Sequence, residues 1–313
     1  MPDTMLAAAI DKAGGPEALS IHHVPVPKPK PGEVLLAVQA AGVGAWEAGI
    51  RRDPGQHAQF PLILGFDGAG TVVAIGAGVR GFQAGDKVYG TGEAFYAQFV
   101  AVRADNIAHA PKSLSPAEAG VLAISGLSAL QGLDDILQVK ADETLIIHGG
   151  TGGVGTLAVQ FAKLRGVKVL ATASSPEGLS LLSRLGADGV VNGRTGDVAA
   201  AARRLAPNGA DAVLGLAGGD SLERCIDALR SDGRGRVACL FGMEPLPQPR
   251  FGVRMTTYSF VSGTHEFERL NRAVDAAKPE VLIAAEYSLA DAAGAHKRLE
   301  EGRLQGKIVL LVA

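Results

Sequence analysis

The fold of this chain is decided by residues 144–155, which read TLIIHGGTGGVG. Residues 144–148 are a short apolar run that predicts a buried strand, and residues 154–165 predict a helix. A glycine turn joins the two elements, which is the setting in which the pattern GxGxxG binds a dinucleotide. The residues of the pattern are Gly150, Thr151, Gly152, Gly153, Val154 and Gly155.

Three glycines of this turn have separate expected tasks. Gly150 permits the sharp turn, Gly152 lets the backbone approach a pyrophosphate, and Gly155 permits close packing of the helix on the strand. The N-terminus of the helix adds unpaired N–H groups and a partial positive charge. The turn therefore predicts a phosphate-binding site; the alternative is a strand–helix turn without a ligand.

Strands and helices alternate beyond the turn. Residues 167–172 and 236–241 predict strands, and residues 176–185 predict a helix between them. This alternation predicts a parallel, doubly wound sheet with helices on both faces. The other elements expected in this part are strands at 190–191 and 211–216 and a helix at 221–229.

The two ends of the chain have a different pattern. The first third is Val-rich and broken by turns of Gly, Pro and Asp, which predicts a β-rich domain. Ser115, followed by Pro116, predicts the start of a helix that runs to about residue 137. The strands expected in the first third are 33–41, 70–75, 87–89 and 95–102. The tail is expected to contain helices at 266–277 and 291–301 and a strand at 307–312, which could belong to either domain.

Length and composition narrow the class of protein. A chain of 313 residues is long enough for two domains. Its net charge is −2, which argues against nucleic acid as a partner, and its apolar runs are too short for a membrane span. Cys225 and Cys239 are the only cysteines and are too few for a disulfide framework. With no signal peptide at the N-terminus, we expect a cytoplasmic protein.

The end of the second strand of the doubly wound part indicates which dinucleotide binds. A site for NAD normally has Asp or Glu there, whereas this chain has Ala173, Ser174 and Ser175. Small hydroxylated residues leave room for a 2′-phosphate, and Arg194 is the candidate cation, so we expect NADPH. Two separate alternatives stay open. Glu177 is the acidic residue if the strand runs longer, and Arg194 is a solvated loop residue without a role in binding.

Several motifs along the chain resemble those of a known family. Residues 60–70, FPLILGFDGAG, are similar to the N-terminal signature of the medium-chain dehydrogenases and reductases. Residues 126–129 and 148–155 are similar to the quinone oxidoreductase, or zeta-crystallin, branch of that superfamily. Further matching pieces lie at 76–79, 85–88, 186–188 and 306–309, so the resemblance covers nearly the whole chain.

The resemblance implies an α/β fold with a GroES-like β-rich domain and a Rossmann domain with a doubly wound parallel sheet. We expect the GroES-like domain at residues 1–120, the Rossmann domain at 121–262 and a return to the first domain at 263–313. The family also implies a homodimer formed through the Rossmann sheets. It places Ser128 near the nicotinamide or the phosphates, with interdomain contact as the alternative. The backbone of Phe241, Gly242 and Met243 would lie against the nicotinamide ring.

The sequence lacks the zinc ligands of other members of the superfamily. Where the first ligand would fall, residues 41–44 read Ala-Gly-Val-Gly, and no group of closely spaced cysteines follows. Without a Lewis acid, alcohol oxidation loses its main source of rate. Reduction of a conjugated acceptor needs less help, because its charge spreads to an oxygen that water can protonate. We therefore expect no metal, and a quinone or another conjugated carbonyl compound as the substrate.

Several positions depart from the quinone oxidoreductase pattern. Gly44 replaces Asn, Glu47 replaces Asp, and a Tyr expected near Gly55 is missing. No proton donor is assigned, and the weak catalytic candidates are His57, in a loop, and Trp46, which either covers an aromatic acceptor or packs in the core.

Four other conspicuous residues have structural interpretations. Tyr96 is expected to be structural, and Arg51 to be a surface or interdomain contact. Asp67 and Asp86 are expected to be anchors of turns and loops.

The sequence thus predicts an NADPH-dependent reductase of quinones or other conjugated carbonyl compounds that needs no zinc. The alternatives are a reductase of 2-alkenals, enones or enoyl thioesters, or an NADPH-binding protein with little turnover.

Overall fold

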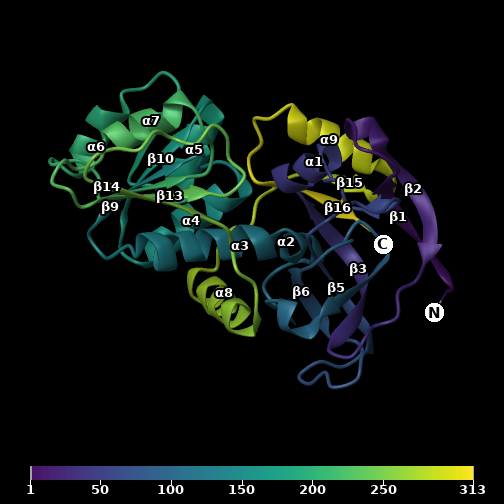
Figure 1. Ribbon diagram of the computed structural model, residues 1–313. Coiled ribbons are helices and arrows are strands. Elements are labelled where there is room, and N and C mark those ends of the chain that lie inside the picture. Colours follow the sequence, from purple (N-terminus) through teal and green to yellow (C-terminus); the bar gives the residue numbers. More distant parts are fainter. Residues whose placement is uncertain (1, 313) are drawn as a thin grey trace. The chain divides into compact units, whose positions relative to one another are not determined.

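The computed structural model describes residues 2–312, which form two compact units. Within the described residues, unit 1 contains 2–124, Ser262–Arg272 and 282–312, and unit 2 contains Ser125–Val261 and Ala273–Val281. Residues 273–281, which the sequence analysis grouped with the C-terminal return, thus pack with unit 2. Figure 1 colours the chain by sequence position and labels the helices and strands of both units.

Unit 1 is built on two sheets. The smaller sheet has the order β2-β1-β4, and the larger has the order β15-β16-β3-β5-β6-β8, with β7 paired to β3. Its strands are β1 (Thr4–Ile10), β2 (Leu19–Pro25), β3 (Glu33–Val43), β4 (Leu62–Ile63), β5 (Asp67–Ile75), β6 (Lys87–Thr91), β7 (Phe99–Arg103), β8 (Ile107–His109), β15 (Ile283–Ser288) and β16 (Lys307–Leu311). The C-terminal strand β16 runs antiparallel to β3, so the strand left unassigned by the sequence belongs to unit 1.

The helices of unit 1 are short. They are α1 (Ala45–Arg52), α2 (Pro116–Gly120) and α9 (Ala292–Glu300), and α3 (Leu122–Gln131) begins in this unit. The predicted cap at Ser115 is confirmed: its hydroxyl accepts from the N–H of Glu118, and the Glu118 carboxylate accepts from the N–H of Ser115. The predicted helix to residue 137 is interrupted at Val121 and ends in a π-helical segment, η3 (Gly132–Leu137).

A network of buried polar groups crosses unit 1. Arg51 is fully buried, and its guanidinium donates to the carbonyl oxygen of Gly14, to Nδ1 of His296 (2.7 Å) and to the carboxylate of Glu300 (2.5 Å). The other ring nitrogen of His296 lies 3.2 Å from the hydroxyl of Tyr96. The expected surface or interdomain position of Arg51 is therefore wrong, since this side chain joins α1 to α9 inside unit 1.

Unit 2 contains a six-stranded parallel sheet with the order β11-β10-β9-β12-β13-β14. Its strands are β9 (Thr144–His148), β10 (Lys168–Ala173), β11 (Gly189–Asn192), β12 (Ala212–Gly215), β13 (Gly235–Leu240) and β14 (Val253–Tyr258). The sequence predicted five of these strands to within a few residues. It missed β14, because the polar residues of VRMTTY hide the edge strand.

Helices cover both faces of this sheet. α6 (Val198–Leu205) and α7 (Asp220–Asp227) pack on one face, where their apolar side chains form a core with Ile146, Val213 and Val237. α4 (Gly153–Leu164) and the segment of α3 and η3 lie on the opposite face (Figure 1). α5 (Pro176–Arg184) connects β10 to β11, and α8 (Thr264–Ala277) is divided between the two units. In the part of the chain from residue 2 to 312, no helix is both long and apolar enough to span a membrane.

Candidate functional site

The glycine turn lies at the point where the order of the parallel strands reverses. From β9 the chain moves outward through β10 to β11, then crosses back to β12 on the other side of β9 and continues through β13 to β14. The loops that leave the carboxyl ends of β9 and β12 therefore diverge. In open α/β sheets this is where ligands bind.

The conformation of the turn differs from the expectation in one respect. The left-handed residue is Gly149 (φ +79°), one position before the predicted Gly150. Gly150 is held by its neighbours instead: its N–H donates to the carbonyl oxygen of Thr172 (3.1 Å), and a Cβ on it would lie 3.0 Å from Leu182. The sharp bend thus depends on the glycine that directly follows His148.

Gly155 and Gly152 have different reasons to be glycine. A Cβ on Gly155 would lie 2.4 Å from the carbonyl oxygen of Gly149, so helix and turn are packed too closely for a side chain. At Gly152 a Cβ would meet nothing nearer than 3.8 Å, and its φ of −74° suits any residue. Within residues 2–312, neither space nor backbone conformation excludes a side chain at Gly152, so glycine is not needed there to avoid a clash, and it leaves the start of α4 without a side chain over it.

Gly152 is the N-cap of α4, and no side chain from residues 2–312 caps it. A helix that begins without a capping side chain directs its first N–H groups and its partial positive charge at whatever binds there. An anion such as a pyrophosphate satisfies both. The residues of this turn therefore fit the phosphate groups of a dinucleotide.

A buried histidine ties the turn to its surroundings. Nδ1 of His148 lies 2.9 Å from the hydroxyl oxygen of Thr172, which also accepts from the N–H of Gly149 (3.3 Å), and Nε2 lies 3.1 Å from the hydroxyl of Ser221. Burial, with Arg224 nearby, lowers the pKa of His148 to about 4. The imidazole is therefore neutral, and it links the ends of β9 and β10 to α7. The sequence analysis missed this role, because the partners are up to 73 residues away.

The end of the second strand packs directly on the glycine turn. β10 ends at Ala173, Ser174 is exposed, and Ser175 is the N-cap of α5, where its side chain accepts from the N–H of Gly178 (3.1 Å). A Cβ on Gly178 would lie 3.0 Å from the methyl group of Thr151. The first turn of α5, which Ser175 caps, therefore packs on the glycine turn through Gly178 and Thr151.

Two charged residues flank this strand end. Glu177 is exposed in the first turn of α5, and its pKa is lowered because its carboxylate accepts from its own N–H and from the hydroxyl of Ser175. Arg194 is exposed in the loop after β11, whose backbone is held by the guanidinium of Arg224 through the carbonyl oxygens of Gly193 and Arg194. The strand does not extend to Glu177.

The remaining candidates for cofactor binding, Ser128 and the segment of residues 241–243, also lie in unit 2. Ser128 is 1% exposed, and its hydroxyl has no hydrogen-bond partner among residues 2–312, although its carbonyl oxygen accepts from the hydroxyl of Tyr258 (2.9 Å). Phe241, Gly242 and Met243 follow β13 at the same edge of the sheet as the glycine turn. Phe241 is 58% exposed, while the Met243 side chain packs in the core.

The weak catalytic candidates, His57 and Trp46, both lie in unit 1. His57 is an exposed turn residue. Trp46 is 47% exposed and meets Phe66 edge to face, which excludes packing in the core, one of its two expected places. Beside Gly44, Nζ of Lys307 lies 2.9 Å from where a Cβ would be. The sequence analysis missed this cation, because Lys307 is far along the chain.

Asp67 is a buried carboxylate rather than a turn anchor. Its Oδ2 accepts from the N–H of Ile124 (3.3 Å), and its Oδ1 has no partner among residues 2–312. Burial raises its pKa to about 6, against the opposing effect of Lys307, and Glu47 raises it further. Within the same described part of the chain, no group of three His, Cys, Asp or Glu side chains could hold a metal ion.

A GroES-like sheet unit combined with a doubly wound parallel unit defines the medium-chain class of dehydrogenases and reductases. Residues 30–112 match the family described as "Alcohol dehydrogenase GroES-like domain", and residues 185–310 match the one described as "Zinc-binding dehydrogenase". The predicted α/β fold class is thereby confirmed.

Similarity to individual proteins identifies the branch of this class to which the chain belongs. The chain is 31% identical to a quinone oxidoreductase of Rattus norvegicus, over 98% of both chains, and 29% identical to a 2-haloacrylate reductase of Burkholderia, over 98% of this chain and 99% of the other. It is also similar to the quinone oxidoreductase of Escherichia coli in complex with NADPH (TM-score 0.88, 26% identity, 98% and 100% covered). The chain belongs to the quinone oxidoreductase branch of the medium-chain dehydrogenase/reductase superfamily.

Proposed function

We propose that this protein is an NADPH-dependent reductase that transfers hydride to a quinone or another conjugated carbonyl compound. One structural observation carries the cofactor half of this proposal: α4 starts at Gly152, where no side-chain cap hydrogen bond is made and no side chain covers the first N–H groups of the helix. The acceptor half is supported by relatives that are named quinone oxidoreductase and cover nearly the whole chain.

The chain's own residues would bind and orient the dinucleotide. The glycine turn and the first N–H groups of α4 bind the pyrophosphate, and His148 fixes the backbone of the turn. Ser128 offers a buried hydroxyl without another partner among residues 2–312, which fits a hydrogen bond to the cofactor. Residues 241–243 would present their backbone to the nicotinamide. When bound, the nicotinamide supplies the hydride.

The proposed class of acceptor substrate is inferred from the negative charge that hydride transfer creates on the acceptor. In a quinone or enone this charge moves to an oxygen, so a well-positioned acceptor needs only water or a weak acid to finish the reaction. Residues 41–44 supply no zinc-binding side chain to stabilise an alkoxide. The similarity to a 2-haloacrylate reductase favours a second candidate substrate, a halogenated conjugated acid.

The test is loss of NADPH absorbance against a panel of acceptors. The panel contains benzoquinone, naphthoquinone, an alkenal, an enone, an enoyl thioester and a 2-haloacrylate, with a saturated ketone as the control. We expect turnover with at least one conjugated acceptor and none with the saturated ketone. Tight NADPH binding without turnover of any acceptor would refute the reductase and favour a binding protein.

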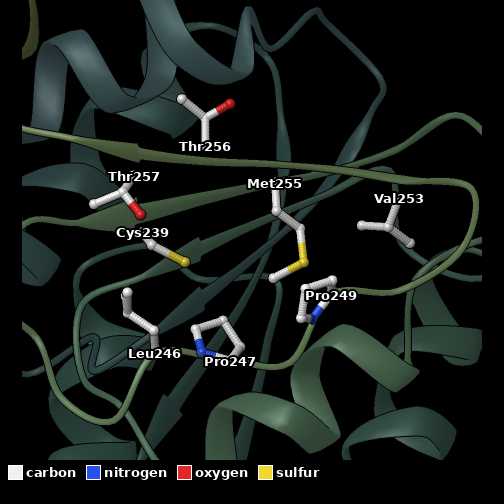
Figure 2. A pocket seen from close by; sticks show the side chains of 8 residues that line it. All are labelled: Cys239, Leu246, Pro247, Pro249, Val253, Met255, Thr256 and Thr257. Atoms are coloured by element: carbon white, nitrogen blue, oxygen red, sulfur yellow. The ribbon is translucent and has the colours of Figure 1, made fainter.

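We also propose a homodimer formed along β14. This strand is the edge of the unit 2 sheet, and the exposed apolar residues Phe241, Leu246, Phe251 and Val261 come from the segments around it. A pocket of about 330 Å³ is lined by residues that include Cys239, Met255, Pro247 and Pro249. Figure 2 shows the side chain of Met255 directed from its strand toward the two prolines. An open strand edge beside apolar groups is a template for a second copy.

The dimer is tested by light scattering coupled to gel filtration. Phe251→Asp should give a particle with the mass of one chain, while Ile75→Asp, which changes an exposed apolar residue of unit 1, should leave the dimer intact. A single-chain mass for the unaltered protein would contradict this proposal.

The domain assignment and the location remain part of the same proposal. Residues 1–120 and 263–313 would form the GroES-like domain, apart from residues 273–281, which pack with unit 2, and residues 121–262 would form the Rossmann domain. A cytoplasmic location is supported by the cysteines, because Cys225 and Cys239 are both buried and unpaired.

A further inference from the structure

The difference between NADPH and NADH is one phosphate, on the 2′-oxygen of the adenosine ribose. In doubly wound folds that oxygen lies at the end of the second strand, which in this chain is Ala173. A site that prefers NADPH needs donors and positive charge there. The residues that follow Ala173 therefore decide the preference.

The donors at this position are already partly used. Ser175 caps α5: its oxygen accepts from the N–H of Gly178, and its hydroxyl donates to the carboxylate of Glu177. Ser174 is exposed and is the remaining side-chain hydroxyl directly after β10. The pair of serines that the sequence analysis assigned to the 2′-phosphate thus offers one available hydroxyl.

The charges at this position oppose each other. Glu177 is an exposed, ionised carboxylate two residues after the N-cap, and Gly178 next to it packs on Thr151 of the glycine turn. The acid is therefore attached to the part of α5 that contacts the cofactor turn. Arg194 is the counterpart, on a loop that Gly193 holds against Thr172 and His148. Arg224 adds a second cation behind this loop, but its guanidinium is bound to the carbonyl oxygens of Gly193 and Arg194. The exposed charges here are thus the anion of Glu177 and the cation of Arg194, which oppose each other.

We propose that Glu177 is a specificity-determining residue that weakens the preference for NADPH over NADH. Its carboxylate repels a 2′-phosphate and keeps the hydroxyl of Ser175 occupied, while it can accept a hydrogen bond from the 2′-hydroxyl of NADH. This inference rests on the proposed function, because it concerns the same cofactor site. It assigns Glu177 the ribose-facing role that acids have in NAD sites, although β10 ends four residues earlier.

A purely structural role makes a different prediction. An acid in the first turn of a helix stabilises that helix through the dipole, and its removal weakens α5 slightly. Such a loss would affect all ligands of the site equally. Discrimination between two ligands that differ only in the 2′-phosphate therefore separates the two roles.

The experiment is calorimetric titration with adenosine 2′,5′-bisphosphate and with 5′-AMP, which needs no acceptor and no turnover. The variants are Glu177→Gln, which removes the charge at nearly constant shape, and Glu177→Lys, which reverses it. Asp275→Asn is the matched control, because it removes one exposed acid elsewhere in unit 2. Each titration is repeated at high salt, which screens exposed charges.

For Glu177→Gln we expect the bisphosphate to bind about tenfold more tightly, with AMP changed less than about twofold, and a larger gain for Glu177→Lys. High salt should reduce these gains, and Asp275→Asn should match the unaltered protein. Equal changes for both ligands, or no change for the bisphosphate, would overturn the role of Glu177. If the unaltered protein bound neither nucleotide, the cofactor site itself would be refuted, which is a distinguishable outcome.

Discussion

Two glycines of one turn should respond in opposite ways to the same substitution. In Gly155→Ala the added methyl group lies 2.4 Å from the carbonyl oxygen of Gly149 and 2.7 Å from Gly150, all backbone atoms that cannot move independently. In Gly152→Ala the nearest atom is 3.8 Å away, and the backbone already has a conformation that alanine adopts. The first change should therefore damage the fold, and the second should damage only the binding of a ligand.

The expected magnitudes follow from these contacts. Overpacking costs about 1–3 kcal/mol, and the rigid partners of Gly155 place it near the upper value, or roughly 10 °C in melting temperature. In Gly152→Ala two effects on the free energy of unfolding oppose each other. Alanine is a poorer N-cap than glycine, which destabilises the folded protein, but it also lowers the entropy of the unfolded chain, so the net change should be within about 1 kcal/mol. Displacing the pyrophosphate by a methyl group breaks hydrogen bonds to a charged group, worth about 1.5–3 kcal/mol each, so NADPH should bind roughly ten- to a hundredfold more weakly.

Urea unfolding measures the first effect, and NADPH titration the second. Both variants are measured by both methods, so that each serves as the control for the other. The reasoning fails if Gly152→Ala unfolds as easily as Gly155→Ala, or if it binds NADPH as tightly as the unaltered protein.

Three further predictions concern buried polar groups. The pKa of His296 is lowered from 6.5 to about 4, chiefly by burial, so the folded state disfavours the charged imidazole. The free energy of unfolding should therefore fall by about 3 kcal/mol as the pH drops from 6.5 to 4. In urea unfolding, His296→Asn should make the free energy of unfolding less dependent on pH over this range. Asp67 has the opposite effect on the pH dependence of stability. Its pKa is raised from 3.8 to about 6, so the free energy of unfolding should fall by about 3 kcal/mol as the pH rises through this range. Asp67→Asn should remove this cost, and an unchanged unfolding curve at pH 7 would contradict it. Ser128→Ala should change the free energy of unfolding by less than about 0.5 kcal/mol, because its hydroxyl loses no hydrogen-bond partner among residues 2–312. The same variant should bind NADPH about tenfold more weakly in a fluorescence titration. Unchanged affinity would exclude Ser128 from the cofactor site.

The local parts of the fold could be predicted from the sequence. The strand of residues 144–148, the glycine turn and the cap at Ser115 are specified by residues within a few positions of each other, and all three were predicted. The left-handed residue was predicted one position too late, because His-Gly-Gly allows either glycine to make the bend. The strand β14 was missed, because an edge strand is only half covered and lacks a continuous apolar pattern.

The buried polar contacts could not be predicted in the same way. Arg51 looks like a surface residue at the end of a short helix, and its partner His296 follows 245 residues later. Lys307 beside Gly44 and the hydrogen bonds of His148 also depend on which strands become neighbours. Strand order is a property of the whole chain, so these contacts appear only once the sheets are assembled.

The pairing of β16 with β3 has a consequence for how the protein is made. Residues 40–43 of β3 pair with residues 308–311, so during synthesis this apolar edge stays unpaired until residues 308–311 have left the ribosome. The sheet of unit 2 lies between these segments in the chain, and its strands are complete by Tyr258. We infer that the middle of the chain folds first and that the nascent β3 edge is the segment most in need of a chaperone.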